Sequence, residues 1–141
     1  MIIKQKIPTI QLAPSVAHSY DIKRYNQAVG GTLISVEDAL NHKELCDWVW
    51  LDEWDLFGPG NSQKKFYTHD TFSSLRNAGY KIALVTPELH STSPGLLGGE
   101  SHPDASSKGK LFTRIKEIIT FSPDAICTDY PEEVKKVVTE S

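Results

Sequence analysis

The chain has 141 residues, of which 39% are hydrophobic and 23% charged, and its formal net charge is -3. This length suits one domain with its own core, and the composition excludes the disordered, fibrous and membrane classes of protein. Nucleic-acid binding is also disfavoured, because it requires a concentrated Lys/Arg surface that displaces counterions. We therefore expect a single domain over residues 1–141 that binds neither nucleic acid nor a membrane.

The N-terminal segment and the two cysteines bear on where the protein is located. The first fifteen residues contain no apolar stretch of secretory length, and no window approaches the roughly 20 apolar residues of a membrane span. Cys46 and Cys127 each lie in an apolar run and are expected as two buried thiols in a reducing compartment. These features predict a cytoplasmic protein.

Four short apolar runs alternate with helical patterns along the chain. The first predicted strand, residues 7–12, contains Pro8, which favours a strand start or a sheet edge. The other three predicted strands span residues 46–52, 81–86 and 125–128. Alternation of strands and helices is typical of βα units, so we expect an α/β fold with a parallel sheet.

The first helices are predicted from their end signals. Ser35 and Asp38 stand three residues apart, which is the spacing of a capping box at a helix start. A second helix is expected over about residues 70–78, where Gly79 supplies a left-handed end. Between residues 15 and 31 a short helix is compatible with the sequence, and residues 32–34 could form a brief strand.

Two further helices follow from apolar spacing. Leu111, Ile115, Ile118 and Ile119 form one stripe, with Arg114 and Glu117 read as lying outside it. The last helix begins at Pro131, a residue favoured at the first helical position. It is expected to bury three apolar residues: Val134, Val137 and Val138.

Two long polar connections, residues 54–67 and 89–109, each follow a predicted strand. Loops after parallel strands meet at the carboxyl edge of a sheet, where such folds bind ligands. The second loop carries Leu96 and Leu97, which require burial, so we expect an ordered lid over a ligand cleft.

Three segments together resemble the second half of glycerophosphodiester phosphodiesterases. Their sequences are DWVWLD at 47–52, AGYKIALVTPE at 78–88 and PDAICTDYPEE at 123–133, which resemble the sixth, seventh and last strands of that family. The resemblance covers about residues 46–138 and implies the C-terminal half of a (β/α)8 TIM-like barrel with phosphodiester hydrolysis. The family's early His-Arg-Gly and Glu-x-Asp block has no counterpart in this chain, so no catalytic residue is carried over.

Acidic residues at the end of the second apolar strand are the densest candidate site. Because side chains alternate along a strand, Glu53 and Asp55 point to one side and Asp52 and Trp54 to the other. Carboxylate oxygens suit a divalent cation such as Mg²⁺ or Ca²⁺, so Glu53 and Asp55 are predicted metal ligands. The alternative is that these acids cap the following loop or remain solvated.

Polar groups also follow the other strands. Glu88 and His90 offer a base or ligand pair, or alternatively a surface pair. With Glu53 they are the predicted catalytic residues. The predicted ligand-binding residues are His18, Asp52, Trp54, His102 and Asp129, with Asp104 nearby in the long loop. Asp129 has a structural alternative, because its carboxylate could cap the last helix.

The function expected from this pattern is binding of a small polar ligand, a phosphate ester or sugar phosphate, at the carboxyl end of a half-barrel. Phosphodiester hydrolysis is its enzymatic version. The alternative is a non-catalytic binding or assembly module that keeps the scaffold. A haloacid-dehalogenase-like phosphatase ranks last, because an Asp-x-Asp nucleophile followed by Thr is absent. Four barrel strands leave open sheet edges, so we expect a homodimer.

Overall fold

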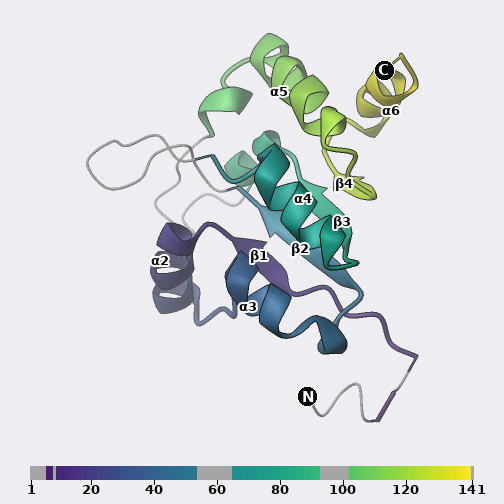
Figure 1. Ribbon diagram of the computed structural model, residues 1–141. Coiled ribbons are helices and arrows are strands. Elements are labelled where there is room, and N and C mark those ends of the chain that lie inside the picture. The colour runs from purple at the N-terminus through teal and green to yellow at the C-terminus, as the bar shows by residue number, and fades with distance from the viewer. Residues whose placement is uncertain (1–5, 8, 54–64, 93–101, 141) are drawn as a thin grey trace.

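The computed structural model describes residues 6–7, 9–53, 65–92 and 102–140, with the backbone alone at 28–29, 90–92 and 140. Four parallel strands and five α-helices make up the described regular structure, together with short 3-10 helices, which confirms the α/β class (Figure 1). The strands are β1 (Ser15–Ala17), β2 (Trp48–Asp52), β3 (Lys81–Val85) and β4 (Ala125–Cys127). The helices are α2 (Ser19–Val29), α3 (Val36–Asn41), α4 (His69–Asn77), α5 (Lys108–Thr120) and α6 (Pro131–Glu140).

The sheet has the order β1-β2-β3-β4, with every pair parallel. The last three predicted strands are confirmed, but the strand predicted over residues 7–12 is wrong, because pairing begins only at Ser15. Upstream of it, Pro14 gives its carbonyl to the amide of Trp50 at 2.9 Å. Proline has no amide to donate, so the chain before β1 contributes acceptors without forming a strand.

The far edge of β1 carries a second parallel neighbour. Ile34 bridges Val16, with the amide of Ala17 donating to Ile34 and the amide of Ile34 donating to Ser15, at 3.2 and 3.0 Å. Carbonyls of successive strand residues point to opposite edges. Since Pro14 bonds β2, the Ser15 carbonyl faces away from β2, and Ile34 lies on the outer side of β1. The brief strand expected at residues 32–34 is therefore a single bridge.

The helix ends follow the predicted cap chemistry. Ser35 and Asp38 form a reciprocal capping box at the start of α3, where the Ser35 hydroxyl accepts from the Asp38 amide at 2.9 Å. The hydrogen bonds from Ser35 lower the pKa of the Asp38 carboxyl. Gly79 follows α4 at a φ of 84°, the left-handed conformation that favours glycine.

The core lies on one face of the sheet. Val16, Val49, Leu51, Ile82 and Leu84 point to this face in register and are fully buried. They pack against Phe72 and Leu75 of α4 and Ile118 of α5. In Figure 1, α3 and α4 cover this face on the viewer's side. Burial of such side chains contributes roughly 1.5–3 kcal/mol each and fixes the strand ends relative to the helices.

Three burial predictions are wrong. Cys127 is exposed because it lies on β4, the outermost strand of the described sheet, whereas Cys46 is buried as expected. Val138 is 49% exposed, since α6 packs on α5 through Val134 instead. Arg114, expected outside the apolar stripe of α5, is only 4% exposed.

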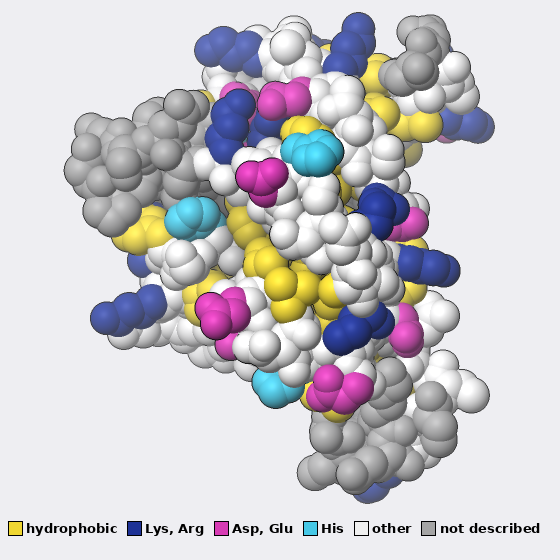
Figure 2. Space-filling view, in the orientation of Figure 1, with side chains coloured by type: hydrophobic (Ala, Val, Ile, Leu, Met, Phe, Trp, Pro, Cys, Tyr) yellow, Lys and Arg dark blue, Asp and Glu magenta, His cyan; other side chains and the backbone are white. Residues whose placement is uncertain are grey.

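The surface is mixed in charge. On the face drawn in Figure 2, Lys/Arg and Asp/Glu side chains are interspersed rather than gathered by sign. Within the described residues, none of the helices is both long enough and apolar enough to cross a membrane.

Candidate functional site

Glu53 occupies the position just beyond β2 at the carboxyl edge of the sheet. Strand alternation continues from Val49 and Leu51, so its side chain turns toward the helices and is 2% exposed. Its Oε2 accepts the amides of Phe66 and Tyr67 at 2.6 and 2.7 Å. Glu53 therefore binds the chain preceding α4 to the end of β2.

Arg114 of α5 is the cation that neutralises Glu53. Its Nη2 donates to Glu53 Oε1 at 2.8 Å, and the Tyr67 carbonyl lies 3.3 Å from the same nitrogen. Its Nη1 is 2.7 Å from Glu117 Oε2, and its Nε is 3.5 Å from Asp104 Oδ2. One guanidinium thus contacts three carboxylates.

The opposite charges around Arg114 stabilise the ionised forms of Arg114 and Glu117. Burial alone would lower the pKa of Arg114, but the charge and hydrogen bond of Glu53, with the contact to Glu117, raise it overall. Burial would raise the pKa of Glu117, but Arg114 and then Lys65 lower it overall. The guanidinium and the carboxylate of Glu117 therefore remain charged at neutral pH.

The sequence reading missed Arg114, although a signal was present. Arg114 follows Leu111 by three residues and precedes Ile118 by four, so it lies on the helix face that these two residues bury. An arginine on an apolar face is a signal of a buried acidic partner.

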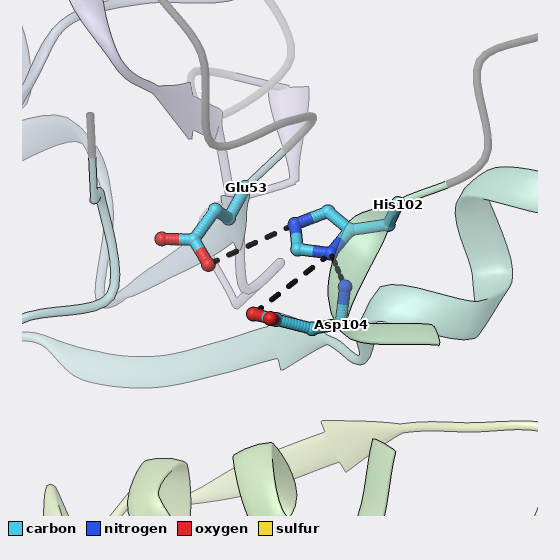
Figure 3. A group of neighbouring side chains, drawn as sticks. All are labelled: Glu53, His102 and Asp104. Atoms are coloured by element: carbon cyan, nitrogen blue, oxygen red, sulfur yellow. Dashed lines mark hydrogen bonds and ion pairs between the residues drawn. The ribbon is translucent and has the colours of Figure 1, made fainter. Parts of the chain in front are cut away.

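The side chains of His102 and Asp104 lie beside Glu53 and point toward it (Figure 3). They belong to the start of the 3-10 helix η4 (Pro103–Ala105), where His102 Nδ1 accepts the Asp104 amide at 3.2 Å. His102 Nε2 lies 4.0 Å from Glu53 Oε1, and Nδ1 lies 4.0 Å from Asp104 Oδ2. In the neutral ring, an accepting Nδ1 places the proton on Nε2, facing Glu53.

Glu53, His102 and Asp104 could hold a metal ion. Each offers a ligand atom, and these atoms all lie within 4.8 Å of one another. Glu53 was a predicted metal ligand, but its predicted partner Asp55 falls outside the described residues. His102 in place of Asp55 makes the donor set one nitrogen and two oxygens, which suits first-row transition ions better than Mg²⁺ or Ca²⁺.

Tyr67 is a further residue that the sequence reading missed. Its hydroxyl lies 2.7 Å from the Val85 carbonyl and 3.0 Å from the Leu51 carbonyl, so it bridges the ends of β3 and β2. Burial, followed by the charges of Asp52 and Glu53, raises the pKa of Tyr67 well above its usual value. Tyr67 is therefore a neutral structural bridge rather than a base.

Glu88 organises a second network at the ends of β3 and β4. Its Oε1 accepts from the hydroxyls of Thr86 and Thr128 at 2.6 and 2.5 Å and from the amide of Asp129 at 3.1 Å. Glu88 is 7% exposed. Like Glu53, this predicted catalytic carboxylate binds two segments of the chain to each other.

The other predicted residues lie at the start of α2, near the ends of β2 and β4, or in segments that the structure describes only in part or not at all. His18 is the N-cap of α2, where its Nδ1 accepts the Tyr20 amide at 3.2 Å. Asp52 ends β2, half-buried, and Asp129 follows β4 next to the Glu88 network. Trp54 lies outside the described residues, as does the glycine-rich part of the expected lid, residues 93–101. His90 is described in its backbone only, within η3 (Pro87–Thr92).

A pocket of about 390 Å³ adjoins the Arg114 network. It is lined by Lys65, Asp104, Gly109, Lys110, Thr113, Arg114 and Glu117. Asp104 and Arg114 belong both to this lining and to the buried cluster around Glu53. These two side chains therefore link the pocket wall to the buried cluster.

Comparison with known proteins gives no relative: no family model, curated protein or solved structure matches this chain. The resemblance to glycerophosphodiester phosphodiesterases thus stays a prediction.

Proposed function

We propose that this protein binds a small phosphate-bearing ligand, a phosphate ester or sugar phosphate, in the pocket beside the Arg114 network. The observation that carries the proposal is that Asp104 and Arg114 line this pocket and also contact the buried Glu53 cluster. Lys65 and Lys110 add two cations, and Thr113 adds a hydroxyl. Such groups suit phosphate oxygens.

A divalent cation at Glu53, His102 and Asp104 is the second part of the proposal. The three ligand atoms lie close enough for one ion. Asp104 also lines the pocket, so an ion bound there would lie near a phosphate ligand and would neutralise part of its charge. The half-barrel remains the proposed fold and draws support from the sequential parallel order of the four strands.

Binding without turnover is the favoured form of this function. Glu53 and Glu88 both accept backbone amides, and Glu53 also pairs with Arg114. The carboxylate oxygens that accept these bonds are already engaged by donors of the chain itself, which leaves fewer lone pairs for a substrate proton. Hydrolysis of a chromogenic phosphodiester, tested with and without Mn²⁺ or Zn²⁺, separates the two forms. Turnover that is lost in Glu53→Gln would establish the enzymatic form.

The binding proposal is tested by thermal-shift titration with glycerol phosphate, glucose phosphate and inorganic phosphate. A ligand at a hundredfold excess over its Kd adds about 2.7 kcal/mol to stability. The double variant Lys65→Gln/Lys110→Gln should lose the shift, whereas Lys135→Gln/Lys136→Gln on exposed positions of α6 should keep it. Absence of any shift with all three probes would overturn the proposal.

The cation is tested separately by titration with Zn²⁺, Mn²⁺, Mg²⁺ and Ca²⁺. We expect Zn²⁺ or Mn²⁺ to raise the melting temperature and Glu53→Gln to abolish that rise. A melting temperature that none of the four ions changes from its value without added ion would contradict a metal site in the wild-type protein.

A further inference from the structure

The Glu53 cluster already contains a cation from the chain itself. Arg114 contacts Glu53 Oε1 at 2.8 Å and Asp104 Oδ2 at 3.5 Å. These are the same two oxygens that face the nitrogens of His102 at 4.0 Å. The guanidinium therefore interacts with the carboxylate oxygens that a metal ion would need.

The charged groups around Glu53 nearly balance one another. Three carboxylates, Glu53, Asp104 and Glu117, are joined by two cations, Arg114 and Lys65, whose Nζ is 3.6 Å from Glu117. With His102 neutral, the group retains one negative charge. A divalent ion next to Arg114 would reverse this balance and would face the repulsion of the guanidinium at close range.

One present partner of Arg114, Glu117, lies on the pocket side. Its Nη1 is 2.7 Å from Glu117, which is 46% exposed on the pocket wall. A rotation of the guanidinium toward Glu117 would keep this ion pair while freeing Glu53 and Asp104. Helix α5 thus provides both the cation, Arg114, and a carboxylate, Glu117, that would still hold it after it leaves Glu53.

We propose that Arg114 is a resting cation of this centre and that a first-row transition ion binds Glu53, His102 and Asp104 only by displacing it. The two occupants are mutually exclusive. When the ion binds, Nδ1 of the neutral His102 ring must give up the amide of Asp104, either because Nδ1 itself becomes the ligand or because it takes the proton that Nε2 releases in order to bind the ion. Metal loading is therefore coupled to release of Arg114 toward the pocket. This inference rests on the metal part of the proposed function.

The decisive comparison is Zn²⁺ affinity, measured by calorimetry, in the wild type, Arg114→Gln and Lys110→Gln. Removing the Arg114 charge should tighten Zn²⁺ binding by about tenfold or more, because a unit charge within a few ångströms is removed. Lys110→Gln removes an equal charge from the pocket wall and should change affinity far less. Unchanged or weaker binding in folded Arg114→Gln would overturn the inference.

A second measurement uses the wild-type protein, because Arg114→Gln leaves Glu53 without its cation and could fail to fold. The ¹⁵N–¹H signal of Arg114 Nε should shift during a Zn²⁺ titration, as the guanidinium leaves Asp104. Zinc bound at Glu53 with this signal unmoved would contradict displacement. Arg114→Lys is the conservative companion, and its Zn²⁺ affinity should lie between those of the wild type and Arg114→Gln.

These results distinguish the inference from the proposed function. Zn²⁺ bound by the wild type, with no gain in Arg114→Gln, would leave the metal proposal standing and reject the exchange. Zn²⁺ bound by Arg114→Gln alone would show that Arg114 blocks the ion without exchanging for it, and would reject both the exchange and metal binding by the wild type. Phosphate binding is read out independently with inorganic phosphate.

Discussion

Tyr67 and Glu53 are hydrogen-bonded in both directions. The Tyr67 amide donates to Glu53 Oε2 at 2.7 Å, and the Glu53 amide donates to the Tyr67 hydroxyl at 3.2 Å. Because the same hydroxyl lies within hydrogen-bond distance of the carbonyls of Leu51 and Val85, the pair links the carboxyl ends of β2 and β3. The side chains of Tyr67 and Glu53 thus provide hydrogen-bond partners for the backbone groups at these strand ends.

Tyr67→Phe should lower the free energy of unfolding by about 1–3 kcal/mol, because it leaves the buried Glu53 amide and a strand-end carbonyl without the hydroxyl. Tyr80→Phe is the matched control. Its hydroxyl donates to the Ala39 carbonyl at 2.6 Å, away from the site. Urea unfolding should show a larger loss for Tyr67→Phe, and equal losses would refute the bridging role.

Glu117 should make stability depend on pH in the acid range. Its pKa is lowered in the folded protein, so its contribution is present above the usual Glu pKa and is lost as pH falls through the folded-state pKa. Glu117→Gln should therefore be less stable than the wild type near neutral pH, and the gap should close below about pH 4. Urea midpoints across this range test it, with Glu132→Gln on exposed α6 as control. A gap that widens toward acid would contradict the sign.

Thr128→Val should destabilise the protein by about 1–3 kcal/mol. The change removes a hydroxyl that donates to Glu88 at 2.5 Å and accepts the Tyr130 amide at 3.1 Å, without altering side-chain volume much. Thr139→Val, at an exposed position of α6, should cost far less. Similar unfolding curves for both variants would show that the Glu88 network does not stabilise the strand ends.

We expect the protein to be a homodimer, with a sedimentation mass near twice the 15.7 kDa of one chain. The outer edge of β4 carries no neighbouring strand among the described residues, and open edges favour pairing with another chain. The Thr86 amide donates to the Cys127 carbonyl at 3.0 Å, so Cys127 faces β3 and, by alternation, the Ile126 amide points outward. Ile126→Pro should therefore yield a monomer, whereas Ile126→Val should not. A monomeric wild type at high concentration would reject this expectation.

Local sequence was sufficient to predict most of the elements. The capping pair of Ser35 and Asp38, Gly79 after α4 and the apolar runs of β2 and β3 are decided by residues within about four positions of each other. Placement of Glu53, Glu88 and Asp129 at the carboxyl edge also followed, because each comes within three residues of a strand end. The strand predicted at residues 7–12 is wrong because only its last residue, Leu12, packs against the core and bonds β2, whereas Ile7 is 51% exposed.

Only the tertiary structure decided which of these groups meet. Glu53 pairs with Arg114 across 61 positions in the sequence, a contact that exists because α5 packs its buried face against the end of β2. The same packing turned the predicted catalytic carboxylates into acceptors of backbone amides, and it brought His102 to Glu53 from a distant loop. Strand periodicity fixes the side to which a side chain points, but the partner on that side is set by how the helices pack.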